Sequence, residues 1–235
     1  MVENYLLRID RNLREEEFDR LLGLIAEEKR QRVRRFRKLE DAQRTLLGDI
    51  LARFALCRKS GLENHRLLFG ANEYGKPLLT APCGLHFSIS HSGAWVACAL
   101  HDRPIGIDVE EIKQIDFAVA ERFFSKAESM ALQVRAEEEK LNYFYMLWTL
   151  KESYIKAEGK GLSLPLNSFT VEIGEGGISL QTEDPQKKNR FFKQFFLDGR
   201  HVFALCAAEE DLCRTHTLLM DNVPDFIGAL TGCCR

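Results

Sequence analysis

The spacing of hydrophobic residues changes along the chain between two periods, and each period predicts one type of secondary structure. Apolar and polar residues alternate over 4–10 and over 105–110, which predicts strands because neighbouring side chains of a strand point to opposite faces. Apolar residues three and four positions apart predict helices, since these positions share one helix face. The predicted helices span 14–30, about 41–56 with Asp41 as the N-cap, about 116–134, and 137–158. The chain is therefore expected to contain both helices and strands.

Two segments predict β-hairpins, in which paired strands are joined by a tight turn. The first covers 87–100 with its turn at 91–93, and the second has arms over 191–197 and 201–207 that turn at Asp198-Gly199. Both return strands are apolar and alike in sequence. That likeness is compatible with an internal duplication and also with coincidence. A further strand is expected near residues 169–173, after the last helix.

The dipeptide formed by Arg103 and Pro104 interrupts the periodic pattern and predicts a boundary between two halves. We therefore expect an N-terminal half over 1–104, a C-terminal half over 105–208 and a C-terminal extension over 209–235. The glycine-rich segment 174–177 and the polar segment 181–190 are predicted to be turns or loops inside the second half.

One face of the predicted strand 105–110 combines two carboxylates with a glycine. Because side chains alternate along a strand, Gly106, Asp108 and Glu110 share this face, while the isoleucines and the valine between them form an apolar face. Two carboxylates beside a residue without a side chain predict a cation site with room for a ligand.

The predicted helix 137–158 adds a third carboxylate, because its period places Trp148, Glu152 and Lys156 one above another. Three oxygen donors suit Mg²⁺, which prefers carboxylates, water and phosphate oxygens. The usual interpretation of Glu152 and Lys156 at this spacing is a solvated ion pair. However, Glu152 falls within an apolar stripe, where a carboxylate is seldom found unless it is paired or bound to a metal.

Composition and charge exclude several classes of protein. The 235 residues suffice for one large or two small domains, and the net charge of −2 argues against a general nucleic-acid binder. No stretch approaches ~18 apolar residues, so neither a membrane span nor a secretion signal is expected. The seven scattered cysteines are typical of reduced thiols in a cytoplasmic protein. A basic run over 29–38 suits either a solvated helix face or a small polyanion.

Two motifs imitate sites that we do not expect here. The segment 70–77 nearly spells a P-loop, but Pro77 stands where the magnesium-binding hydroxyl belongs. We interpret the segment as a turn at which the backbone and Lys76 approach a planar or phosphorylated ligand. Ser90 and His91 suggest a hydrolase, but the chain has no Gly-x-Ser-x-Gly elbow to present a nucleophile.

Several short segments, taken together in their order, resemble the signature of one enzyme family. They are Tyr74-Gly75-Lys76-Pro77, Phe87-Ser88-Ile89-Ser90-His91-Ser92-Gly93, Ile105-Gly106-Ile107-Asp108-Val109-Glu110, Arg122-Phe123-Phe124-Ser125 with Glu128, Trp148-Thr149-Leu150-Lys151-Glu152-Ser153-Tyr154-Ile155-Lys156, and Gly159-Lys160-Gly161-Leu162-Ser163-Leu164-Pro165-Leu166. The family is that of the 4′-phosphopantetheinyl transferases of the long, surfactin-synthetase-activating type. The resemblance runs from about residue 5 to about residue 208.

The resemblance implies a fold, a reaction and partners. The fold would be of the α+β class, with two similar α/β halves related by a pseudo-twofold axis and the active site between them. The reaction would transfer 4′-phosphopantetheine from coenzyme A to a serine of apo peptidyl or acyl carrier domains of non-ribosomal peptide, polyketide or fatty acid synthases. It would require Mg²⁺ and release 3′,5′-ADP. A chain that contains both halves of a pseudo-dimer would act as a monomer.

The resemblance also assigns roles to individual residues. Those expected to bind coenzyme A are Lys29, Arg32, Arg44, Thr45, Tyr74, Gly75, Lys76, Pro77, Ser90, His91, Asp108 and Lys156. Those expected to bind the metal are Asp108, Glu110 and Glu152. Glu152 would remove the serine proton, bind the metal, or do both, and Lys156 would stabilise the departing phosphate.

Two other functions remain open on sequence grounds. A non-catalytic module that binds coenzyme A or carrier proteins would not need three carboxylates at one place, which argues against it. A nucleic-acid binder would need basic residues interleaved with aromatic ones over a wide surface. The carrier-binding region that the family resemblance implies includes Phe117, Val119, Phe123, Phe124 and Met130, several of which also suit an ordinary hydrophobic core.

Overall fold

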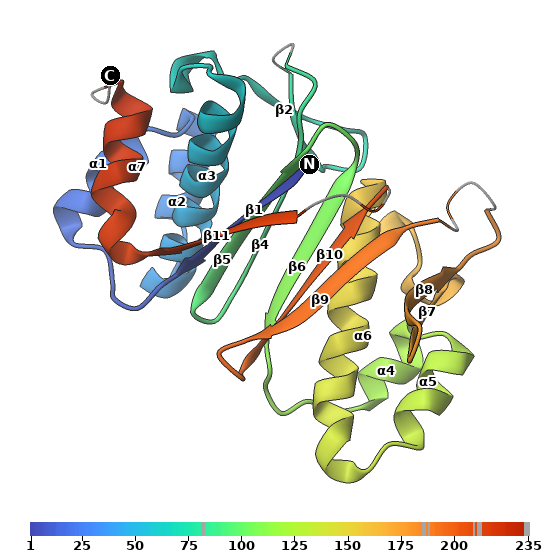
Figure 1. Cartoon of the computed structure of the whole chain (residues 1–235). Helices are drawn as coiled ribbons and strands as arrows, with labels where there is room; N and C mark the ends of the chain where they lie inside the picture. Colours follow the sequence, from blue (N-terminus) through green and yellow to red (C-terminus); the bar gives the residue numbers. More distant parts are fainter. Residues whose placement is uncertain (81–82, 185–186, 188, 209, 211–212, 233–235) are drawn as a thin grey trace. The chain divides into compact units, whose positions relative to one another are not determined.

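A computed structural model of the chain describes residues 1–235 apart from 81–82, 185–186, 188, 209, 211–212 and 233–235 (Figure 1). The chain forms two compact units. Unit 1 comprises Met1–Gly70, Pro77–Asp102 and Leu212–Arg235, and unit 2 comprises Ala71–Lys76 and Arg103–Asp211.

Unit 1 is built on a sheet with the strand order β11-β1-β5-β4. These strands are β1 (Val2–Arg8), β4 (His86–Ser92), β5 (Trp95–His101) and β11 (Cys213–Leu219). The predicted hairpin is confirmed: β4 and β5 pair antiparallel, and Gly93 has a φ of 52° in the turn. Every residue of β5 is buried, as expected for an inner strand of the sheet.

Four helices belong to unit 1: α1 (Glu15–Gly23), α2 (Glu27–Arg34), α3 (Leu39–Ser60) and α7 (Val223–Thr231). The prediction of one helix over 14–30 is wrong, because α1 ends at Gly23 and a separate helix, α2, begins at Glu27. Arg30 donates hydrogen bonds to the carbonyls of Gly23 (2.8 Å) and Ile25 (2.9 Å), which compensates for bonds lost at the break. The buried side chain of Ile25 anchors this break in the core.

The long helix α3 differs from its prediction at both ends. It begins at Leu39 with Lys38 as the N-cap, so the predicted cap Asp41 lies in the first turn instead. A carboxylate there is still favourable, because the N-terminus of a helix carries partial positive charge. The helix continues to Ser60, and Gly61 ends it with a φ of 72°, a left-handed conformation that glycine adopts readily.

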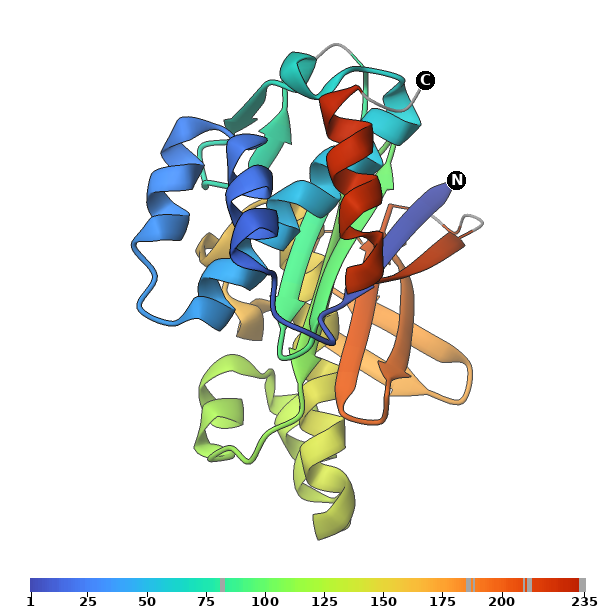
Figure 2. The ribbon, with the colours of Figure 1, turned by 90° about the vertical axis from the view of Figure 1, so that its left-hand side faces the viewer.

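The C-terminal part of the chain completes unit 1. Strand β11 pairs in parallel with β1 over seven residues, from Val2 opposite Cys213 to Arg8 opposite Leu219. Helix α7 packs on α3, and its residue Phe226 is fully buried in the same core as β1 and β5 (Figure 2). The described residues of the extension expected over 209–235 thus include β11 and α7, which pack in unit 1.

Unit 2 is built on a sheet with the strand order β6-β10-β9, against which one long helix packs. The strands are β6 (Ile105–Glu111), β9 (Phe191–Leu197) and β10 (His201–Ala207), and the helix is α6 (Glu137–Glu158). The bounds predicted for α6 and for both hairpin arms are confirmed. Asp198 and Gly199 have φ values of 47° and 69°, as the predicted tight turn requires.

Smaller elements complete unit 2: α4 (Ala118–Phe123), α5 (Lys126–Gln133), β7 (Thr170–Gly174) and β8 (Gly177–Gln181). The prediction of one helix over 116–134 is wrong, because a new helix begins after Ser125. The Ser125 hydroxyl accepts a hydrogen bond from the Glu128 amide, and the Glu128 carboxylate accepts one from the Ser125 amide. This capping box starts α5 as a separate helix.

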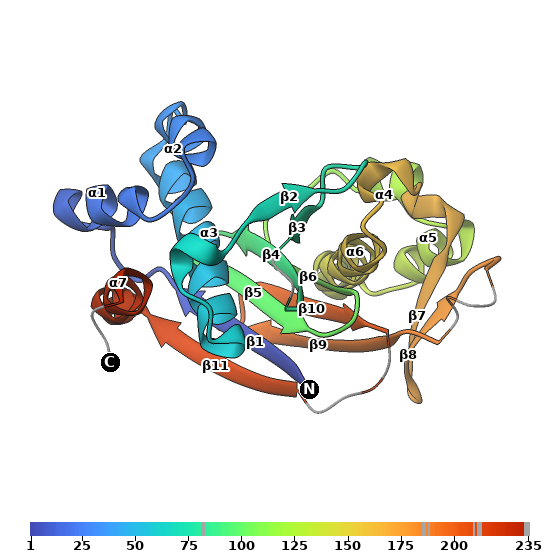
Figure 3. The same cartoon turned by 90° about the horizontal axis from the view of Figure 1, so that it is seen from above.

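The two units repeat one topology, which confirms the expectation of two similar halves. In each unit a first strand (β1 or β6) precedes a 22-residue helix and then a hairpin, whose second strand pairs antiparallel with the first strand. Both helices end at a glycine in the left-handed conformation, Gly61 and Gly159. Figure 3 shows each helix lying on one face of its own sheet. A short pair, β2 (Phe69–Ala71) and β3 (Pro77–Leu79), forms a separate two-stranded sheet.

Candidate active site

The backbone of α6 packs directly against Gly106 of β6. A Cβ atom on Gly106 would lie 2.0 Å from the Ser153 carbonyl oxygen and 2.3 Å from the Ala157 amide nitrogen. The helix backbone therefore occupies the space beside this glycine. The prediction that Gly106 leaves room for a ligand is wrong: it leaves room for α6, which brings the polar face of β6 beside the last turns of the helix.

This approach places Asp108 beside Lys156. The Lys156 ammonium donates a hydrogen bond of 2.7 Å to the Asp108 carboxylate, whose side chain is 4 % exposed. Burial raises the pKa of the Glu152 carboxyl, the negative charge of Asp108 raises this pKa further, and Lys156 opposes the rise. The two carboxylates thus repel each other, and the Lys156 ammonium acts on both.

Glu110 lies two residues beyond Asp108 on the same face of β6, opposite Val202 of β10. It is partly exposed, whereas Asp108 is buried. After burial, the negative charge of Glu110 also raises the pKa of the Tyr145 phenol, so Glu110 lies close enough to Tyr145 of α6 to affect it. Tyr145 precedes Glu152 on the same helix by about two turns.

The residues around Asp108 have the chemistry of a cation site, but they do not form a complete metal cage. Asp108 and Glu152 are hard oxygen donors whose mutual repulsion a divalent cation would relieve. Among the described residues, however, no group of three or more His, Cys, Asp or Glu side chains is arranged to hold a metal ion. The set of Asp108, Glu110 and Glu152 as metal ligands therefore stays a prediction.

The turn that contains Lys76 is bound to the end of α6. The Lys76 ammonium donates to the carbonyl oxygens of Lys156 (2.6 Å) and Ile105 (3.1 Å), and burial lowers the pKa of this ammonium to about 8. Tyr74 and Gly75, at the tip of the turn, are exposed. The tip of the turn is thus exposed, and its approach to a ligand stays a prediction. The expectation that the Lys76 side chain approaches a ligand is not met here, because its ammonium is bound to two backbone carbonyls inside unit 2.

The remaining residues assigned to coenzyme A, apart from Pro77, lie where α3 packs on β4 and where α2 meets α3. A Cβ atom on Gly48 of α3 would lie 3.2 Å from the Ile89 side chain and 3.7 Å from the His91 side chain, so Arg44 and Thr45 lie about one turn before the place where α3 packs on β4. Arg44 donates hydrogen bonds to the Gly93 carbonyl (3.2 Å) and to Asp41 (2.5 Å). The group consists of Arg44, Thr45, Ser90 and His91, together with Lys29 and Arg32 on α2.

Lys29 and Arg32 differ in their surroundings. The Lys29 ammonium pairs with the buried carboxylate of Asp49, which also accepts a 2.6 Å hydrogen bond from Arg53. Lys29 also lies 5.2 Å from the centre of the Phe69 ring. Arg32 is exposed. Lys29 therefore already neutralises a buried carboxylate, whereas Arg32 is accessible to an anion.

Two charged residues of unit 2, Lys151 beside Glu152 on α6 and Glu128 on α5, received no role from the sequence. The Lys151 ammonium lies 2.6 and 2.7 Å from the two carboxylate oxygens of Glu128, and it also donates to the Phe169 carbonyl (2.8 Å). Both side chains are almost inaccessible, at 0 % and 1 %. The sequence did contain a sign of this ion pair, because Lys151 stands among apolar residues of α6, and a charge placed there needs a buried partner.

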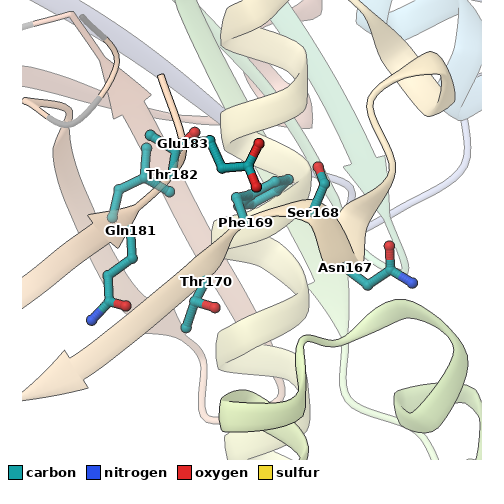
Figure 4. Close-up of a pocket in the computed structure, with 8 residues that line it drawn as sticks. Asn167, Ser168, Phe169, Thr170, Gln181, Thr182 and Glu183 are labelled. Carbon is teal, nitrogen blue, oxygen red and sulfur yellow. The ribbon is translucent and has the colours of Figure 1, made fainter. Parts of the chain in front are cut away.

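Two hollows in unit 2 are lined by other residues than Asp108, Glu152 and Lys156. An open hollow of about 490 Å³ lies beside Phe169 and the start of β7, where Figure 4 shows the polar side chains of Thr182 and Glu183 near the Phe169 ring. A smaller hollow of about 190 Å³ lies at α4 and α5 and is lined by residues that include Phe117, Ala120 and Leu132. The second one overlaps the region in which carrier binding was expected.

The comparison with protein families covers residues 12–206. Residues 104–206 match the 4′-phosphopantetheinyl transferase superfamily, and residues 12–103 match the family described as 4′-phosphopantetheinyl transferase, N-terminal. The 4′-phosphopantetheinyl transferase Sfp of Bacillus subtilis (strain 168) is 44% identical over 216 residues, which are 92% of this chain and 96% of the relative. The 4′-phosphopantetheinyl transferase gsp of Aneurinibacillus migulanus is 41% identical, over 85% of this chain and 83% of the relative.

Solved structures give a weaker and partial likeness. Holo-[acyl-carrier-protein] synthase of Thermotoga maritima is 22% identical with a TM-score of 0.40, over 46% of this chain and 64% of that chain. The holo-(acyl-carrier-protein) synthase of Bacillus anthracis, solved in complex with CoA (3′,5′-ADP), is 19% identical with a TM-score of 0.37, over 44% of this chain and 92% of that chain. Each therefore matches less than half of the present chain.

Proposed function

The chain belongs to the 4′-phosphopantetheinyl transferase family, and from that premise we propose that it moves the 4′-phosphopantetheine group of coenzyme A to a serine hydroxyl of an apo carrier domain. It is a transferase. The observation that carries the proposal is the group formed by Asp108, Glu152 and Lys156, where α6 packs directly on Gly106 of β6.

The proposed reaction is a single displacement at phosphorus. The serine oxygen of the carrier attacks the β-phosphorus of coenzyme A, the one that bears pantetheine. A new phosphorus–oxygen bond forms, and the bond from this phosphorus to the oxygen bridging it to the α-phosphate breaks. The electron pair leaves with 3′,5′-ADP, and the serine loses its proton. Positioning and charge stabilisation supply most of the rate in such reactions.

Each residue of the Asp108 group has a role that follows from its surroundings. Glu152 is a half-buried carboxylate whose raised pKa makes it a better proton acceptor than an ordinary glutamate, so we assign it the serine proton. The Lys156 ammonium can stabilise negative charge on the departing phosphate. Asp108, together with Glu110 and Glu152, would hold Mg²⁺, which neutralises charge on a diphosphate when it is bound.

Residues of unit 1 are proposed to bind the phosphates and the nucleotide of coenzyme A. Arg44, Thr45, Ser90 and His91 lie where α3 packs on β4, and they offer donors to phosphate oxygens. Arg32 is an exposed cation for the nucleotide end, with Lys29 on the same helix. The turn formed by Tyr74, Gly75, Lys76 and Pro77 would approach the adenine through its exposed backbone.

The carrier domain is proposed to dock on α4 and α5. Val119 and Met130 have exposed side chains, at 37% and 66%, and the hollow of about 190 Å³ lies between these helices. Phe124 is excluded from direct contact, because it is buried at 3% and packs on Phe144. Of the five residues expected here, Val119 and Met130 therefore fit a docking surface best.

The setting of the enzyme is also part of the proposal. We expect a cytoplasmic monomer that acts on carriers of peptide, polyketide or fatty acid synthases. The five described cysteines are free thiols, which suits a reducing compartment, while Cys233 and Cys234 lie outside the described residues. Among the described residues, no helix has both the length and the apolar character to cross a membrane.

The decisive experiment incubates the protein with an apo carrier domain, coenzyme A and Mg²⁺ and follows the mass of the carrier. A gain of one phosphopantetheine group supports transfer, whereas binding without mass gain supports the alternative of a non-catalytic module. Glu152→Gln should lower the rate at least ~100-fold without unfolding the protein. Glu172→Gln, an exposed glutamate on β7, is the matched control and should leave the rate unchanged.

A further inference from the structure

Lys156 is bound through both its side chain and its backbone carbonyl. Its ammonium donates to Asp108 (2.7 Å), while its carbonyl oxygen accepts a hydrogen bond from the Lys76 ammonium (2.6 Å). Lys156 lies in the last turn of α6, where carbonyl groups lack partners within the helix. Lys76 therefore supplies a hydrogen bond that the helix itself cannot supply.

Asn72 binds the same helix end from the same turn. Its amide nitrogen donates to the Gly159 carbonyl (2.6 Å), and its amide oxygen accepts from the backbone of Tyr74 (3.0 Å) and Lys76 (2.8 Å). Gly159 has a φ of 71°, and a Cβ atom there would lie 3.1 Å from Asn72 and 3.2 Å from Lys76. The helix end and the turn thus fit each other closely.

We propose that Asn72 and Lys76 are positioning residues, which clamp the last turn of α6 so that Lys156 reaches Asp108. Neither side chain needs to touch coenzyme A for this role. The Lys76 ammonium also donates to the Ile105 carbonyl (3.1 Å) at the start of β6, so one side chain joins the strand of Asp108 to the helix of Lys156. A small displacement of a positioned group is enough to lower a rate by about 100-fold.

The clamp links the turn that contains Tyr74 to the reacting groups. If the nucleotide of coenzyme A rests on this turn, as the proposed function has it, the same turn both receives the substrate and sets the position of Lys156. This inference rests on the proposed function, because the importance of Lys156 for transfer is part of it. A ligand role for the Lys76 side chain predicts a different kinetic result.

The test measures kcat and the KM for coenzyme A for Lys76→Met, alone and combined with Lys156→Met. Positioning predicts that Lys76→Met lowers kcat about 10- to 100-fold and leaves KM within about threefold. In the Lys156→Met background the same change should lower kcat less than about twofold, because its effect passes through Lys156. A raised KM with unchanged kcat, or equal effects in both backgrounds, would overturn the proposal.

Two further variants guard against a failure to fold. Asn72→Ala removes the bond to Gly159 together with the two bonds that hold the turn, from the Tyr74 and Lys76 amides, and should lower kcat in the same sense. Lys76→Arg keeps donors at the helix end and should retain more activity than Lys76→Met. Lys59→Met is the matched control, since it likewise removes a hydrogen-bonded lysine ammonium, which in this case lies 2.7 Å from the Glu3 carboxylate in unit 1. Its kcat should stay at the wild-type value.

Hydrogen exchange separates this inference from the proposed function. The Gly159 amide, which donates to Ile155 at 2.9 Å, should exchange about tenfold faster in Lys76→Met than in the wild type or in Lys59→Met. Unchanged exchange would overturn the clamp whatever the activity. If the wild type transfers nothing while exchange responds as expected, the proposed function fails and the clamp stands.

Discussion

Lys151 and Glu128 form a buried ion pair in which one ammonium lies 2.6 and 2.7 Å from both oxygens of one carboxylate. Lys151 precedes Glu152 on α6, and Glu128 accepts hydrogen bonds from the Ser125 and Val171 amides as well. The pair therefore joins α5, β7 and α6. Burial lowers the pKa of Lys151 to about 8, and the charge of Glu128 opposes this effect.

We predict that Lys151→Met lowers the free energy of unfolding by roughly 3–5 kcal/mol, because it leaves the Glu128 carboxylate buried without its cation. Denaturant unfolding measures this change. The double variant Lys151→Met with Glu128→Gln should be less destabilised than Lys151→Met alone, since no charge is then left unpaired. Lys126→Met, an exposed lysine on α5, should change stability by less than about 0.5 kcal/mol. A loss no larger than that of Lys126→Met would contradict the prediction.

Gly106→Ala should be poorly tolerated, because its methyl group would overlap the backbone of α6 at the Ser153 oxygen. We expect the free energy of unfolding to fall by about 3 kcal/mol, at the upper end of overpacking effects. The transfer rate should fall as well, since α6 carries Glu152. Gly23→Ala has open space around its new methyl group and serves as the control. Equal stability of the two variants would show that α6 does not need this close approach.

Phe226→Ala tests whether α7 is an integral part of unit 1. Phe226 is fully buried and packs on Phe54 of α3, with ring centres 4.9 Å apart. We expect a loss of about 3–5 kcal/mol in the free energy of unfolding. Phe196→Ala, which truncates a 44% exposed ring on β9, should cost much less. A small effect at Phe226 would mean that the C-terminal helix is dispensable.

Glu17 should make stability depend on acid pH. The hydrogen bond from Arg11 lowers the pKa of Glu17 to about 2, and Arg14 adds to the effect. Because this pKa is lower than the ordinary value of 4.5, the stabilisation is complete above about pH 4.5 and is lost as pH falls toward 2. The wild type should exceed Glu17→Gln by roughly 2 kcal/mol at pH 7 and by less at pH 3. Glu16→Gln, an exposed neighbour, should show no such pH-dependent gap. A gap of equal size at both pH values would exclude this role of Glu17.

Removal of divalent cations should stop the transfer reaction. Asp108 and Glu152 repel each other without a shared cation, so a chelator in excess should abolish carrier modification, and Mg²⁺ should restore it. Thermal unfolding with and without Mg²⁺ provides a second measurement, and Asp108→Asn should weaken any stabilisation by the metal. Continued transfer in excess chelator would rule out the metal role.

Most of the regular elements follow from local sequence patterns. Helix α6 carries an uninterrupted apolar pattern, and its end at Gly159 is typical of a left-handed C-cap, so its bounds could be predicted. The breaks after Gly23 and before Ser125 were missed because the apolar period continues across them. At Ser125 the deciding signal was a capping box, and at Gly23 it was hydrogen bonding from the nearby Arg30 side chain to the backbone, which the apolar period does not show.

The candidate site divides in the same way. The nearness of Asp108, Glu152 and Lys156 could be predicted, because strand and helix periods put each of them on a definite face. The direction of the Lys76 side chain could not be predicted, since a turn has no repeating pattern that assigns its side chains to a face. The partners of Lys76 are also backbone carbonyls far along the chain. The partner of Lys151 depended likewise on the packing of α5 against α6.

The parallel pairing of β11 with β1 sets an order for assembly during synthesis on the ribosome. β1 is among the first segments to emerge, but its neighbour β11 follows the whole of residues 103–211. One edge of the nascent N-terminal sheet therefore stays uncovered until the rest of the polypeptide has been translated. Nearly all of unit 2, in contrast, comes from one continuous stretch of the chain. Exposed edges of this kind attract other strands, so the waiting period is when this chain is most liable to misassemble.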